Sequence, residues 1–150
     1  MALRRDGDRT TVLLGDDERA LLVDLAEQFR SVLADDADPD LRRLYPAAYA
    51  DDPERDADYA GLVHDDLLRT RLDAVETVLG SADAPSIADD ELAAWMQLLN
   101  GLRLLLGTRL DVSEEDGFDP EAPDVAERSL LLWLGLLLEE AVEASLGFLR

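Results

Sequence analysis

The chain has 150 residues and a mass of 16.5 kDa, and its 47% hydrophobic and 33% charged residues are typical of one folded domain rather than a disordered tail. Thirty-five acidic residues against 14 basic ones give a formal net charge of −21, which excludes non-specific binding to nucleic acid or to anionic membranes. The sequence has no cysteine and one histidine, which excludes disulfides, thiol redox sensing and metal sites built from several histidines.

Residue usage favours helices along nearly the whole chain. The sequence contains 31 leucines against nine valines and one isoleucine, and β-branched residues are the ones that favour strands. We therefore predict an all-α domain, a bundle of four main helices with a small N-terminal β-hairpin. A single helical domain spans residues 1–150, with the hairpin in 1–14 and the helices in 15–150.

The hairpin is predicted from residues 2–14. Asp6-Gly7 lies between two short segments, and Asp-Gly is a preferred pair for a type I′ turn because both central residues need a positive φ. An isolated hairpin is only marginally stable in water, so this one must pack on the helices.

Apolar residues at spacings of three and four predict helices at about 16–34, 54–79 (or 57–79), 89–110 and 124–148, with a linker at 81–88. The most apolar stretch, residues 130–138, is too short to cross a membrane, which takes about 20 residues. It is apolar nearly all round, and this predicts either a central helix or a homodimer formed through it. The N-terminus has arginines with no apolar run behind them, unlike a signal peptide, so we expect a cytoplasmic protein.

No motif predicts catalysis, a metal or a cofactor. His64-Asp65-Asp66 resembles a fragment of a metal or acid–base site, but the further histidines that such a site needs are missing, so we interpret it as a solvated helix face. Glu139, Glu140 and Glu143 lack the Glu-x-x-His pair of ferritin-like sites. An oxygen-only magnesium or calcium site stays an alternative for these carboxylates.

The arginines carry more information. Arg103 is surrounded in sequence by leucines, so we predict that it is half buried and paired with an acid of the second helix, Glu76 first and Asp73 second. One interpretation is that Arg103 forms an ion pair that only stabilises the fold. The functional interpretation is that Arg103, together with Arg109, forms a site for an anion or a protein partner. A ligand pocket near Arg103, Asn100 and Arg109 follows from the same residues.

Three small basic islands interrupt the acidic surface. Arg4, Arg5 and Arg9 lie on the hairpin, Arg42 and Arg43 follow the first helix, and Arg69 and Arg71 lie on the second helix. We interpret them as ion-pair partners in solvent. The first two islands are nevertheless the places where the expected lack of DNA binding would first fail.

Several motifs are distinctive in their order and spacing, although none of them is a known catalytic or ligand-binding motif. They are Arg-Leu-Tyr-Pro-Ala-Ala-Tyr at 43–49, Asp-Asp-Pro-Glu at 51–54, Asp-Asp-Leu at 65–67, Arg-Leu-Asp-Ala-Val-Glu-Thr-Val-Leu at 71–79, Trp-Met-Gln-Leu-Leu-Asn-Gly-Leu-Arg-Leu at 95–104 and Leu-Gly-Thr-Arg-Leu at 106–110. Together they resemble the actinobacterial family, long described as a domain of unknown function, that is named after AosR, an oxidative-stress transcriptional regulator. The likeness covers nearly the whole chain.

The resemblance implies a cytoplasmic regulator of transcription that contacts an RNA polymerase sigma factor and senses oxidation through a cysteine pair. This chain has no cysteine, so the redox switch does not carry over. We expect a non-enzymatic regulator, with no cofactor, that binds a basic protein surface such as the DNA-binding region of a sigma factor, and no direct binding of nucleic acid or membrane. The alternative is a small-ligand-binding or enzymatic helical domain with its pocket near Arg103 and Asn100.

Overall fold

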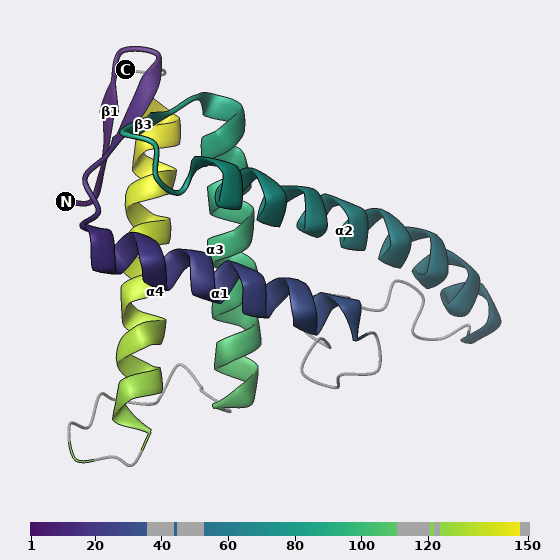
Figure 1. The fold of residues 1–150 in the computed structure, drawn as a ribbon. Helices are drawn as coiled ribbons and strands as arrows, with labels where there is room; N and C mark the ends of the chain where they lie inside the picture. Colours follow the sequence, from purple (N-terminus) through teal and green to yellow (C-terminus); the bar gives the residue numbers. More distant parts are fainter. Residues whose placement is uncertain (36–43, 45–52, 111–120, 122–123, 148–150) are drawn as a thin grey trace.

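The computed structural model describes residues 1–35, 44, 53–110, 121 and 124–147, with the backbone alone over 53–60 (Figure 1). The predicted four helices and N-terminal hairpin are confirmed. The elements, in chain order, are β1 (Leu3–Asp6), β2 (Arg9–Val12), α1 (Asp16–Ala34), α2 (Pro53–Ser81), β3 (Ser86–Ile87), α3 (Asp89–Arg109) and α4 (Val125–Leu146).

The hairpin turns one residue later than the sequence pattern predicts. Asp6 pairs with Arg9, so the two turn residues are Gly7 and Asp8 rather than Asp6 and Gly7. Gly7 has a φ of 64°, the positive value that the tight turns of hairpins require and that glycine adopts without strain.

A third strand extends the hairpin where the sequence predicts only a linker. β3 pairs antiparallel with β2, opposite Thr10 and Thr11, and the strand order is β1-β2-β3. With three strands, the sheet packs one face on the helices, where Leu3, Val12 and Ile87 are buried. This gives the hairpin the support that it lacks alone.

Figure 1 shows α3 and α4 side by side and antiparallel, with α1 crossing both. α2 packs on α3 and α1 near its C-terminal end, and its N-terminal part extends past the other helices. The sheet lies at the end of the bundle where α4 finishes, and β1 contacts α4. No helix in the described part of the chain combines the length and the apolar character needed to cross a membrane.

The central helix is α3, not α4. α3 contacts α1, α2, α4 and β2, and it buries nine residues, whereas α4 buries four and packs on α3 and β1. Among the residues that the structure describes, the two largest fully buried side chains are Trp95 of α3 and Phe29 of α1. Gly101 makes the close crossing of α1 and α3 possible, because a Cβ at this position would lie 2.7 Å from Cζ of Phe29.

Candidate functional site

The outward side of α4 exposes an apolar pair in line with two carboxylates. Leu132 and Leu136 are 55% and 61% exposed, and Glu139 and Glu143 are also exposed. The four positions recur at intervals of four, three and four residues, so they form one face of the helix. We call these four residues the outer face of α4.

Arg103 contradicts the sequence prediction. It is exposed rather than half buried, and its Nε would lie 3.6 Å from a Cβ at Gly135, so it lies along α4 and not toward α2. Glu76, its expected partner, forms an ion pair with Arg30 of α1 at 2.7 Å, and Asp73 is exposed. The Arg30–Glu76 pair is itself open to solvent, with side chains 45% and 62% exposed, so it contributes at most about 1 kcal/mol.

The predicted site residues therefore do not come together. Asp73 and Glu76 lie on α2, whereas Arg109 lies in the last turn of α3 at the opposite end of that helix from the sheet. Asn100 lines a small cavity of about 150 Å³ between α2 and α3, together with Leu67, Thr70, Arg71, Gln97 and Gly101. Arg103 is not among the residues that line this cavity.

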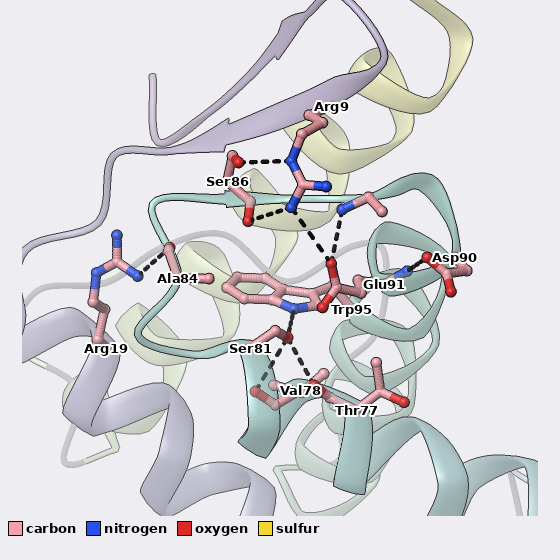
Figure 2. A network of polar contacts seen from close by, with 11 residues as sticks. Arg9, Arg19, Thr77, Val78, Ser81, Ala84, Ser86, Asp90, Glu91 and Trp95 are labelled. Atoms are coloured by element: carbon pink, nitrogen blue, oxygen red, sulfur yellow. Dashed lines mark hydrogen bonds and ion pairs between the residues drawn. The ribbon is translucent and has the colours of Figure 1, made fainter.

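Two of the three hairpin arginines, Arg5 and Arg9, make contacts within the fold. Arg5 pairs with Asp89 at the start of α3. Arg9 donates from Nε to Oγ of Ser86 at 2.8 Å and lies 3.9 Å from Glu91 (Figure 2). These contacts hold the sheet on the start of α3. Arg42 and Arg43 lie outside the described residues, as do most of the motif at 43–49 and the first residues of 51–54.

Arg19 is a structural residue that sequence reasoning missed. Its guanidinium donates to four backbone carbonyls: Nε to Leu14 at 3.0 Å, Nη1 to Ala82 at 2.7 Å and Ala84 at 2.9 Å, and Nη2 to Val12 at 2.9 Å. Its contact with Ala84 is visible in Figure 2. The side chain therefore joins the start of α1 to the segment between α2 and β3.

The position of Arg19 in the chain was a usable signal. It follows Asp16, Asp17 and Glu18 in the first turns of α1, where the helix dipole favours acids and disfavours a cation. A cation placed there needs acceptors elsewhere, and the partly buried carbonyls of the neighbouring segments supply them.

A buried hydrogen bond joins α2 to α3 at the same end of the bundle. Nε1 of Trp95 donates to Oγ of Ser81 at 2.9 Å, and that hydroxyl donates to the carbonyl of Thr77 at 2.7 Å (Figure 2). Ser81 is 2% exposed and Trp95 is 1% exposed. The polar atom of the largest core side chain is thus satisfied inside the core.

A cavity of about 240 Å³ lies between α1, α3 and α4. Its walls are apolar, and three polar residues complete the lining: Gln28 of α1, Arg109 of α3 and Glu127 of α4. All three are exposed, so they form the solvent side of the cavity. The apolar lining residues are Leu25, Phe29, Val32, Leu102, Leu105, Leu106, Leu130 and Leu134.

The carboxylates considered as metal ligands, Glu139, Glu140 and Glu143, do not form a metal site with other described residues. Glu140 accepts the backbone N–H of Ala2 at 3.0 Å and so ties the N-terminal strand to α4. Among the described residues, no three His, Cys, Asp or Glu side chains gather as a metal site requires.

Comparison with known proteins places the chain in a family. No curated protein and no solved structure matches it. A family model described as "Domain of unknown function (DUF2017)" matches residues 1–145, nearly the whole chain. The protein therefore belongs to this family of unknown function.

Proposed function

We propose that the protein is a non-enzymatic regulator that acts by binding a basic surface of another protein through the outer face of α4. One observation carries this proposal: Leu132 and Leu136 stand exposed on a helix whose next two turns present Glu139 and Glu143 on the same face. An apolar anchor beside acidic groups complements a partner that presents apolar side chains flanked by arginine or lysine.

The energies favour such a contact. Each leucine exposes more than half of its surface, so burying it in an interface contributes about 1 kcal/mol or more. The net charge of −21 attracts a basic partner over a distance of about 8 Å at physiological ionic strength. The same charge opposes binding to the phosphates of duplex DNA.

The resemblance to the AosR-type regulators supports a partner of a particular kind. A DNA-binding region of a sigma factor is basic and is therefore suited to an acidic face. On this proposal the chain is an actinobacterial cytoplasmic protein and contacts a sigma factor without a cysteine switch. Its likeness to that family rests on the motifs at 43–49 and 51–54 and on those along α2 and α3, not on the outer face of α4.

The test measures the affinity of the chain for the purified principal sigma factor of its source organism. The variant Leu132→Ser/Leu136→Ser removes the apolar anchor, and Leu62→Ser on α2, where Leu62 is 73% exposed, is the matched control. We expect the double variant to bind about tenfold to a hundredfold more weakly and the control to bind like the parent protein.

If the double variant and the parent protein bound the sigma factor with equal affinity, the outer face of α4 would not be the binding surface. Absence of binding by the parent protein would remove the sigma factor as partner. Because all three leucines are exposed, circular dichroism should show the same folded state for every variant.

A further inference from the structure

We propose that the outer face of α4 binds an amphipathic helix of the partner, in which one acidic residue pairs with Arg103 and two basic residues pair with Glu139 and Glu143. This assignment rests on the proposed function and adds to it the form of the docking segment and the order of its charges. The exposed leucines anchor the helix, while the charged residues decide which helices fit.

The shape of the face favours a helix over an extended segment. Backbone N–H and C=O groups in the middle of α4 are bonded within the helix, so they offer no edge for pairing with a strand. Gly135 lies next to Leu136 and three residues after Leu132, and its missing side chain leaves room beside the two leucines. A side chain of a second helix fits there, because helices pack by inserting side chains between those of their neighbour.

Arg103 supplies a positive charge beside this face. A Cβ at Gly135 would lie 3.6 Å from Nε of Arg103, and Gly135 neighbours Leu132 and Glu139 on the helix surface at spacings of three and four residues. Arg103 is exposed and forms no hydrogen bond or ion pair with any residue that the structure describes, although the chain has 35 acidic residues. Such an arginine complements a carboxylate of the partner, which its planar guanidinium binds through two parallel hydrogen bonds.

The spacing of the charges on α4 sets their spacing on the partner. Gly135, Glu139 and Glu143 are four residues apart, or about 6 Å along the axis at 1.5 Å per residue. A helix that packs roughly along α4 has the same rise, so its acid and two bases also recur at intervals of four. The order acid, base, base fits a parallel helix, and the order base, base, acid fits an antiparallel one. An acid between the two bases sets like charges against each other in either direction.

The experiment titrates the full chain with two labelled synthetic peptides, each held helical by the same side-chain cross-link, and follows fluorescence anisotropy. Both have the same leucine stripe, composition and net charge. Beside the stripe, the matched peptide has Glu, Lys and Lys at intervals of four residues, and the control peptide has Lys, Glu and Lys. We expect the matched peptide to bind at least about tenfold more tightly, because the control sets a lysine against Arg103 and a glutamate against Glu139.

Reversing the charge of Arg103 tests its role. Arg103→Glu should weaken binding of the matched peptide about tenfold. Arg69→Glu makes the same change of charge on α2, where the side chain of Arg69 is 72% exposed, and should change the affinity by less than about twofold. A third peptide, with Lys in place of the Glu, should bind Arg103→Glu more tightly than Arg69→Glu, although the two variants have the same net charge. Both positions are exposed, so both variants should fold.

Equal affinities of the matched and control peptides would overturn the proposal, since apolar contact and net charge would then account for the binding. Equal effects of Arg103→Glu and Arg69→Glu would overturn it as well, and so would the absence of saturable binding. A dimer of the chain that Leu132→Ser/Leu136→Ser abolishes and the matched peptide does not displace would overturn it in favour of a second copy at this face.

The proposed function fails by a different result. It requires that Leu132→Ser/Leu136→Ser weaken sigma-factor binding, whatever the order of charges that the face prefers. Loss of sigma-factor binding in that variant, together with equal affinities of the two peptides, would therefore leave the proposed function standing and remove only the matched helix.

Discussion

Arg19 shows how one side chain can hold three segments of this fold together. Its four acceptors come from β2, from the segment before α1 and from the segment between α2 and β3. A lysine could not reproduce these contacts, since only the planar guanidinium presents donors in several fixed directions.

We expect Arg19→Ala to lower the free energy of unfolding by about 3 kcal/mol, because it leaves partly buried carbonyls without donors. Urea denaturation followed by circular dichroism measures this. Arg103→Ala is the control and should change stability by less than about 0.5 kcal/mol, because Arg103 is exposed. A larger loss from Arg103→Ala than from Arg19→Ala would contradict the structure.

Two buried threonines differ in whether their hydroxyls are bonded. Oγ1 of Thr10 is buried without a hydrogen-bond partner among the described residues, while Oγ1 of Thr108 donates to the carbonyl of Leu104 at 2.8 Å. We therefore expect Thr10→Val to be neutral or stabilising by up to about 1 kcal/mol, and Thr108→Val to be destabilising by about 1 kcal/mol. Thermal unfolding of both variants measures the difference. Equal destabilisation by the two would contradict this assignment.

The prediction for Arg103 was wrong for a geometric reason. Leu102, Leu104 and Leu105 are its neighbours in sequence, but adjacent residues of a helix point in different directions, so they say little about its surroundings. α3 is apolar on most of its faces because it packs between α2 and α4, and this hides which positions remain outside. Arg19, by contrast, lies in the first turns of α1, where the helix dipole disfavours a cation. This departure from the usual residue preferences of helices could be recognised in the sequence.

At the scale of the elements, the helices and the hairpin were predictable from the sequence. Which elements pack against one another was not. The spacing of apolar residues at intervals of three and four places all four helices. The run at 130–138 indicated either a central helix or a homodimer formed through it. The central helix is α3, since composition does not reveal how many faces of a helix are covered, and the homodimer stays a prediction. β3 has two residues, too few for any alternation to appear, and it depends on pairing with β2.

The bond between Trp95 and Ser81 provides a test of the contact between α2 and α3. Ser81→Ala should cost about 1–3 kcal/mol of stability, because it leaves the buried Nε1 of Trp95 without an acceptor. Trp95→Phe removes the same bond together with part of the core. In a double-mutant cycle by urea denaturation we expect a coupling energy of about 1 kcal/mol. Strictly additive effects would show that the bond does not contribute to stability.

At the scale of the whole molecule, the net charge sets how salt affects association. Salt favours self-association and weakens binding to a basic partner. A second copy bound at the outer face of α4 would bring two chains of −21 together, with Glu139 and Glu143 near the contact. The possible homodimer expected from the sequence is thus opposed by repulsion at low salt. A basic partner at the same face experiences attraction instead.

Light scattering over a range of salt concentrations tests self-association. We expect the monomer mass of 16.5 kDa at low salt, with any dimer growing as salt is added, because screening weakens the repulsion between copies. The variant Leu132→Ser/Leu136→Ser should stay monomeric throughout. A dimer that becomes stronger as salt is removed would contradict an interface at this acidic face.

The most direct test of the proposed function is the association rate with the purified sigma factor, measured by stopped flow from about 50 to about 300 mM salt. We expect the rate to fall about tenfold or more across this range while dissociation changes much less. Glu139→Gln/Glu143→Gln should lower the low-salt rate and flatten the salt dependence more than Asp73→Asn/Asp83→Asn, which removes two exposed charges elsewhere. A rate that does not depend on salt, or equal effects of the two variants, would contradict the account.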